Sequence, residues 1–143
     1  SETAKPCTDL EQVLSSSKLE TVIICPSNPF LSIDPILSVK GIKEGLKQNR
    51  AKVIAVTPIV GGDAVKGPTA KNLRDLGYPV SALAVAKYYS SFIDGFILDK
   101  EDEQDAPLIE SLGIKVCLED TIMIDLKSKI RLAERVLDFS KSL

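Results

Sequence analysis

The segment "TVIICPSNPFLSIDPILSVKGIKEGLKQNRAKVIAVTPI", residues 21–59, contains two short apolar runs separated by a loop and a helical pattern. The runs, 21–25 and 52–59, are rich in β-branched residues and apolar at successive positions, which is typical of strands buried on both faces. Between them, apolar residues recur with helical spacing from Pro35 to about Gln48. Because a crossover helix returns the chain to the same end of a sheet, the two strands are predicted to be parallel.

The same alternation continues along the chain. Further strands are predicted at 95–99 and 114–120, and a capping box at Thr8 and Glu11 predicts an early short helix. The pattern indicates a single α/β domain over residues 1–143, an open parallel sheet of about four strands with helices on both faces (Rossmann-like). Other helices are predicted up to Gly77, over 81–92, over 104–112 and from Asp125 onward, the last marked by Leu126, Ile130, Ala133, Val136 and Leu137.

Composition narrows the function classes. A net charge of -2 gives no electrostatic reason to expect nucleic acid or an anionic membrane surface as a partner. No apolar run is long enough to span a bilayer and the start lacks a signal-peptide core, so we expect a cytoplasmic protein whose three cysteines are reduced. Histidine is absent, which excludes a Ser-His or Cys-His pair and a His-ligated zinc within this chain.

The loop after the first strand is the first candidate site, because ligands of open parallel sheets bind beyond the carboxyl ends of the strands. Its prolines exclude a regular helix or central strand over 25–35. Ser27, Asn28 and Ser32 are candidate donors to phosphate oxygens, next to the free amides of the following helix. In the alternative interpretation the loop is only a turn, in which Ser32 or Asp34 caps that helix.

The loop after the second strand, "GGDAVKGPT" at 61–69, is the second candidate. Gly61 and Gly62 would let backbone amides approach an anion, and Lys66 would place a positive charge on it. The loop lacks the Gly-Lys-Ser/Thr run of a P-loop, and a flexible connector whose Pro68 starts the next helix explains the same residues.

Two carboxylates end strands at the same predicted edge. Asp99 and Asp120 are weak candidates for holding magnesium, although strand-end aspartates are also common turn residues. No G-x-G-x-x-G fingerprint follows any strand, which disfavours a dinucleotide-dependent dehydrogenase. The residues alone therefore predict a phosphate-type site without naming a substrate.

Several long loops together resemble one known family. "VIICPSNPFLSIDPILSVKGIKEGL", "VIAVTPIVGGDAVKGPTAKNL", "SALAVAKYYSSFIDGFILD" and "LGIKVCLEDTIM" are similar, in order, to blocks of the 2-phospho-L-lactate transferase (CofD) family. The resemblance implies a transferase of coenzyme F-420 biosynthesis. It implies transfer of a phospholactyl-type group from a guanosine diphosphate carrier to a deazaflavin acceptor, with magnesium and release of GMP.

Carried onto this chain, the resemblance implies two loops and a late motif around the donor diphosphate. Asp34 stands where the family usually has glycine. Catalytic residues are not assigned, and Asp120 and Thr121 form the late motif. The implied diphosphate-binding positions are Pro26, Ser27, Asn28, Pro29, Ser32, Ile33, Gly61, Gly62, Lys66, Gly67 and Thr121, with Pro68 in the second loop.

Family chains are about twice as long, so the resemblance implies that these residues are the C-terminal half and that an N-terminal half is missing. The isolated chain is therefore expected to bind nucleotide without catalysing transfer, and the oligomeric state, including a homodimer, stays open. The alternative is a non-catalytic nucleotide-sugar-binding regulator of the same superfamily, whose members tend to read Gly-Pro-Gly-Ser where this chain reads Cys-Pro-Ser-Asn.

Overall fold

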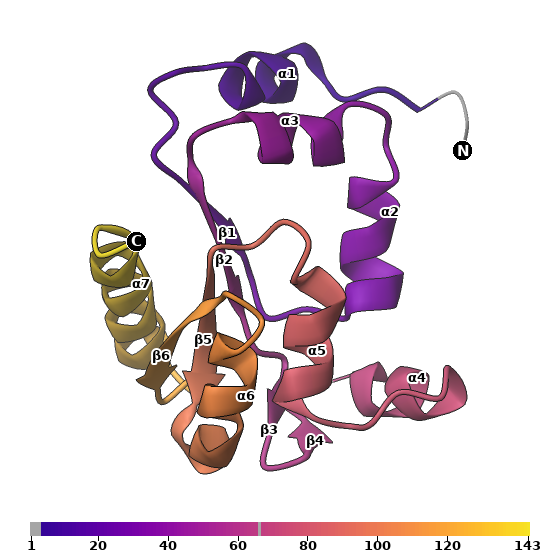
Figure 1. The fold of residues 1–143 in the computed structure, drawn as a ribbon, viewed down its shortest axis with the longest axis vertical. Coiled ribbons are helices and arrows are strands. Elements are labelled where there is room, and N and C mark those ends of the chain that lie inside the picture. The colour runs from indigo at the N-terminus through magenta and orange to yellow at the C-terminus, as the bar shows by residue number, and fades with distance from the viewer. Residues whose placement is uncertain (1–3, 66) are drawn as a thin grey trace.

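The predicted parallel sheet is present in the computed structural model, which describes residues 4–65 and 67–143 (Figure 1). Four strands pair in the order β1-β2-β5-β6, and every neighbouring pair is parallel. The prediction of an α/β fold with about four parallel strands is confirmed. The strands are β1 (Thr21–Ile24), β2 (Lys52–Val56), β5 (Gly95–Asp99) and β6 (Lys115–Glu119).

Helices cover the two faces of this sheet unequally. The larger core lies on one face, where β2 and β5 supply residues such as Val53 and Phe96, and where all but one of the described α-helices pack. The opposite face carries Ile54, Val56 and Ile97 and is covered by a single helix, α7 (Leu126–Ser140). The others are α1 (Thr8–Leu14), α2 (Asp34–Leu37), α3 (Ile42–Gln48), α4 (Thr69–Asp75), α5 (Ala82–Tyr89) and α6 (Ala106–Glu110).

The predicted continuous helix over 35–48 is wrong. A π-helical turn, η1 (Pro29–Ile33), leads into the single turn of α2, and the chain then breaks before α3. Gly41 causes the break, because its φ of 94° is a left-handed conformation that does not continue a helix. Its amide donates to the Glu44 carboxylate at 3.2 Å, which starts α3 in a new direction.

One further local prediction is corrected. Thr8 does not cap α1, since it is the first helical residue and Cys7, which precedes it, makes no side-chain cap bond. The predicted terminal helix is confirmed, and of the apolar residues that marked it only Val136 is buried. Leu132 is the other buried residue of α7, and the stripe of Leu126, Ile130 and Leu137 is exposed.

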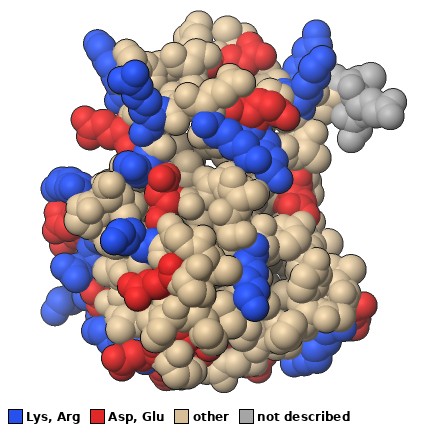
Figure 2. Space-filling view, in the orientation of Figure 1, with Lys and Arg blue, Asp and Glu red and all other residues tan. Residues whose placement is uncertain are grey.

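Charges of both signs are interspersed on the face shown in Figure 2. Among the described residues, no helix combines the length and apolar character required to cross a membrane. None of the three cysteines, all of which the structure describes, forms a disulfide.

Candidate functional site

A small cavity lies where the chain leaves β1, β2 and β6. Its volume is 150 Å³, and its described lining includes residues 26–28 after β1, Thr57 and Pro58 after β2, Thr69 at the start of α4, and Thr121 after β6. These segments are far apart in sequence and meet because the carboxyl ends of parallel strands share one edge (Figure 1). The cavity is therefore at the edge where the sequence placed the site.

Asn28 is the central side chain of this cavity. Its Oδ1 accepts hydrogen bonds from the amides of Phe30 at 3.0 Å and Leu31 at 3.1 Å, so Asn28, rather than Ser32 or Asp34, caps the first helical turn of the loop. These two donors also fix the orientation of the amide, because a flipped group would place an NH₂ against them.

The other end of the Asn28 amide has no partner among the residues that the structure describes. The residue is only 8% exposed, and within the described part of the chain its Nδ2 makes no hydrogen bond. A buried donor left unpaired costs about 1–3 kcal/mol, so native structures seldom retain one without an acceptor nearby. An acceptor-rich ligand in the cavity would satisfy this donor.

The remaining predicted residues of this loop fall into two groups. Pro26 and Ser27 line the cavity beside Asn28. Pro29 is buried at the start of η1, and Ile33 packs against the main core. Ser32 is exposed and lies outside the described lining of the cavity; its amide donates to the Asn28 carbonyl at 3.0 Å.

Asp34 has a different role from the predicted helix cap. Its carboxylate accepts a hydrogen bond from the Tyr88 hydroxyl of α5. Burial, followed by this bond to a carboxylate, raises the pKa of Tyr88 to about 12. Asp34 thus ties the loop to α5, beside a packed aromatic group in which the rings of Phe30 and Tyr88 lie 5.0 Å apart.

The glycine-rich loop folds as a small antiparallel hairpin, formed by β3 (Ile59–Val60) and β4 (Asp63–Ala64). Gly61 and Gly62 form its turn with φ values of 58° and 77°, as a two-residue turn of this kind requires. The Gly61 amide donates to the Asp102 carboxylate at 3.1 Å, and neither glycine belongs to the described lining of the cavity.

The second half of that loop contains Lys66 and Gly67, which the sequence also predicted to contact the anion. Gly67 has a left-handed φ of 72°, just before Pro68 and α4. Lys66, the predicted positive charge, lies outside the described residues. The turn of the loop is therefore occupied by a protein carboxylate, and an anion contact from its second half stays a prediction.

Asp99 connects β5 to the loop after β6. It is 4% exposed, and its Oδ2 accepts from the Thr121 amide at 2.8 Å and the Thr121 hydroxyl at 2.7 Å. Its Oδ1 accepts from the Glu101 amide at 3.0 Å. Burial by itself would raise the pKa of Asp99, but these three bonds stabilise the carboxylate and the pKa is lowered. Asp99 thereby positions Thr121 at the cavity.

Asp120 is engaged elsewhere. Its carboxylate lies 3.0 Å from the Arg131 guanidinium of α7, and Arg131 also donates to its carbonyl at 2.9 Å. Among the described residues, no group of three or more acidic or cysteine side chains is placed to hold a metal. Asp99 and Asp120 are each bonded to protein groups, and their role as magnesium ligands stays a prediction.

Comparison with known proteins identifies the same family that the loop sequences resemble. A family model described as "2-phospho-L-lactate transferase CofD" matches residues 1–129. This chain belongs to the 2-phospho-L-lactate transferase family. The 2-phospho-L-lactate transferase of Methanocaldococcus jannaschii is 41% identical over 140 residues, and that of Methanosarcina acetivorans is 43% identical over 120 residues.

The match covers the chain far better than it covers the relatives. It spans 98% of this chain but 43% of the M. jannaschii protein, and 84% of this chain but 38% of the M. acetivorans protein. The chain therefore spans less than half the length of these transferases, as the resemblance implied.

Five of the described lining residues were not singled out from the sequence, among them two threonines; the five are Thr57, Pro58, Val65, Thr69 and Met123. Thr57 is buried, and its hydroxyl donates to the Ile59 carbonyl at 2.7 Å, which turns the chain from β2 into the hairpin. Thr69 is buried in the first turn of α4 and lines the cavity. Their positions in the sequence could have indicated them, since each threonine lies where an apolar strand ends or a helix begins.

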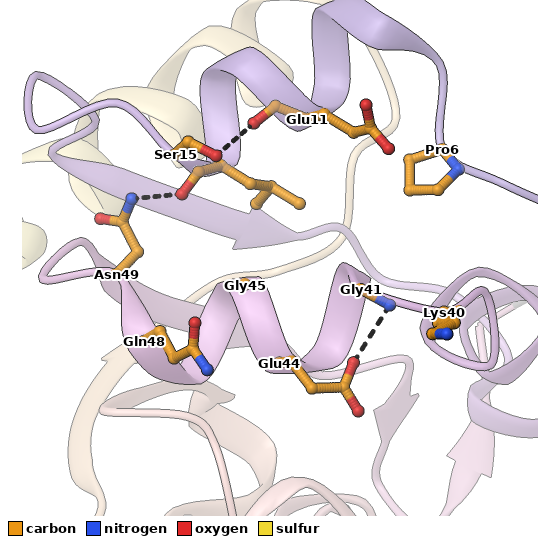
Figure 3. A pocket seen from close by; sticks show the side chains of 10 residues that line it. Pro6, Glu11, Ser15, Lys40, Gly41, Glu44, Gly45, Gln48 and Asn49 are labelled. Atoms are coloured by element: carbon orange, nitrogen blue, oxygen red, sulfur yellow. Dashed lines mark hydrogen bonds between the residues drawn. The ribbon is translucent and has the colours of Figure 1, made fainter.

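A larger hollow of the transferase segment lies elsewhere. It has a volume of 660 Å³ and is lined by residues of α1 and α3, the helices that precede β1 and β2 (Figure 3). Two of its polar side chains are bonded within the protein: Asn49 donates to the Leu14 carbonyl at 2.7 Å, and Ser15 to the Glu11 carbonyl at 2.8 Å. Unlike the cavity at Asn28, its described lining contains no buried side-chain donor without a partner, so size alone does not favour it.

Proposed function

We propose that this chain forms the nucleotide-diphosphate side of a transferase that moves a phospholactyl-type group from a guanosine diphosphate carrier to a deazaflavin acceptor in coenzyme F-420 biosynthesis. Membership of the 2-phospho-L-lactate transferase family supports the reaction class. The observation that carries the assignment of the site is the buried, unpaired Nδ2 of Asn28 in a cavity at the strand ends.

The chemistry of the cavity suits a diphosphate. Asn28 offers an N–H donor and Ser27 a hydroxyl, while the described lining carries no carboxylate that would repel phosphate. In the proposed reaction the acceptor hydroxyl attacks the phosphorus that bears the lactyl group, and GMP leaves with the bridging oxygen. Donors on the diphosphate would stabilise the negative charge that grows on the departing nucleotide.

Magnesium stays a prediction from the family resemblance, and no step is assigned to it here. Asp99 and Asp120 are bonded to protein groups, so we propose that metal ligands come from the part of the protein that this chain does not span. For the same reason we propose that the isolated chain binds nucleotide without turnover. Alignment of two substrates can supply ~7–11 kcal/mol of a barrier, and it requires sites for both.

The test separates the cap of Asn28 from its free donor. Asn28→Asp keeps an oxygen that caps Phe30 and Leu31 but replaces Nδ2 with a second acceptor oxygen. A hydrogen bond to a charged group is worth about 1.5–3 kcal/mol, so GDP affinity measured by calorimetry should fall by about ten- to hundredfold or more. Gln48→Glu makes the same amide-to-acid change at the larger hollow and should leave GDP affinity unchanged.

Three results would contradict the proposal. They are equal GDP affinity in Asn28→Asp and wild type, loss of affinity in Gln48→Glu, and binding of UDP-sugars in preference to GDP, which would favour the regulatory alternative. Turnover is checked by GMP release with donor, acceptor and magnesium. Release by the 143-residue chain alone, at the rate of a full-length relative, would show that the segment is a complete enzyme.

A further inference from the structure

One face of strand β1 is left open. Ile23 pairs in register with Ile54 of β2, and paired positions of parallel strands project to the same side of a sheet. Ile54 is fully buried beneath α7, whereas Ile23 is 37% exposed and Cys25, two residues further on, is exposed. On the other side of β1, Ile24 is buried in the main core. The sheet is thus covered on the α7 side above β2 but not above β1.

The helix next to this opening has a second apolar stripe. Leu132 and Val136 of α7 are buried against the sheet. Leu126, Ile130 and Leu137 are 71%, 50% and 48% exposed, although their spacing of four and seven residues is that of a packed helix face. A helix with two apolar faces is typical of one packed between two layers.

The exposed stripe lies on the flank of α7 that is opposite its ionic contacts. Arg135 bonds Glu119, the last residue of the edge strand β6, and Arg131 bonds Asp120, the next residue. At 3.6 residues per turn, the stripe is about 140° around the helix from these arginines. Since β6 and β1 are the opposite edges of the sheet, the stripe lies on the β1 side of α7.

We infer that Ile23, Leu126, Ile130 and Leu137, here called the open face, dock an apolar helix from the N-terminal half of the family fold. Parallel sheets with one uncovered face are rare because their strands are apolar on both sides. The matched relatives have more than half of their length outside this segment, since the chain covers at most 43% of them. The unmatched part of the relatives supplies a layer to cover the open face. This docking surface is separate from the proposed nucleotide site.

A second copy of this chain is the competing occupant, and the open face argues against it. Ile23 of β1 lies directly beside Ile54 of β2, which is fully buried. A layer that covers Ile23 would therefore extend the same internal core. The matched M. jannaschii relative has more than half of its length outside the segment that this chain covers, and that length is available within the same chain to cover the core.

The experiment produces the 143-residue chain together with the part of the M. jannaschii relative that it does not match. Light scattering after size exclusion gives the stoichiometry, and titration gives the affinity. We expect a one-to-one complex that Leu126→Glu with Ile130→Glu weakens at least about a hundredfold, because two buried aliphatic side chains are lost. Leu76→Glu with Leu108→Glu changes two similarly exposed leucines away from α7 and should stay within about threefold of wild type.

Folding is checked on the isolated chain, where both double variants should unfold within about 2 °C of wild type because all four side chains are exposed. The inference is overturned if wild type forms no complex, or if Leu126→Glu with Ile130→Glu binds as wild type does. It is also overturned if the control pair loses affinity equally, or if the open face mediates only a homodimer of this chain.

Discussion

The loop after β1 is rich in proline and serine, the loop after β2 is rich in glycine, and the two loops use their backbone donors differently. In the β1 loop, Asn28 caps two amides with its oxygen and leaves its nitrogen unpaired in a cavity. In the β2 loop, the hairpin turn is closed by glycines, and the Gly61 amide is taken by the Asp102 carboxylate. The capacity to bind an anion therefore depends on which donors remain unsatisfied after folding, and glycine content alone does not indicate it.

One aspartate at the end of β5 supports the cavity, and another just after β5 supports the hairpin. Asp99 supports the cavity through Thr121, and Asp102 supports the hairpin through Gly61. The comparison therefore predicts that changes around Asp99 and Asn28 affect ligand binding, whereas changes around Asp102 and Gly61 affect stability alone.

The largest expected effect is that of Asp99→Ala. The substitution removes a buried carboxylate that accepts three hydrogen bonds and leaves the Thr121 amide and hydroxyl without their acceptor. We expect the free energy of unfolding to fall by ~3 kcal/mol and GDP affinity to fall with it. Urea denaturation and calorimetry measure the two quantities. Full stability in the variant would show that Asp99 does not hold the cavity together.

Gly61→Ala should cost stability but not binding. A Cβ at this position would lie 2.8 Å from the Glu101 Oε2, and its φ of 58° disfavours any residue with a side chain. The left-handed conformation costs about 1–2 kcal/mol for alanine. GDP affinity should stay within about twofold of wild type, because the Gly61 amide is already bonded to Asp102. If the variant has normal stability but no longer binds GDP, the glycine turn is part of the anion site.

Asp102→Asn tests the opposite pKa shifts of the two aspartates. Burial raises the pKa of Asp102, so the folded protein favours its protonated form, and ionisation above its unfolded pKa of about 4 lowers stability. The asparagine side chain cannot ionise and keeps an oxygen for Gly61, so this variant should be slightly more stable than wild type at pH 7, by at most about 1 kcal/mol. The difference should vanish below about pH 4.

Asp99 supplies the control for that measurement. Its pKa is lowered, so its contribution to stability is present above its unfolded pKa and is lost as the pH falls through its folded pKa. The Asp102→Asn variant should therefore still lose stability in acid, because Asp99 is still present. A variant that is less stable than wild type at pH 7 would show that the Asp102 charge stabilises the hairpin.

The smallest effect is expected for Ser32→Ala. The sequence made Ser32 a candidate ligand, but its side chain is exposed outside the cavity lining, and Asn28 caps the turn in its place. Stability should change by less than about 0.5 kcal/mol, and GDP affinity by less than about twofold. A tenfold loss of affinity in calorimetry would extend the site along η1.

The sequence by itself determined the sheet. Continuous β-branched runs separated by helical spacing admit little except a parallel α/β fold, and they also locate the carboxyl edge where the cavity lies. The family was recognisable for the same reason, since several unusual loops occur in order. These features are local or topological, and neither depends on which side chains finally touch.

Tertiary structure decided the contacts. Asn28, Ser32 and Asp34 all suit a cap by type, and only the π-helical turn after Pro29 showed which oxygen meets the free amides. Asp34 was taken instead by Tyr88, 54 residues away. Likewise both stripes of α7 have helical spacing, so the sequence could not show which one packs on the sheet. Hydrogen bonds and burial are satisfied over the whole fold, and partners distant in sequence compete for each group.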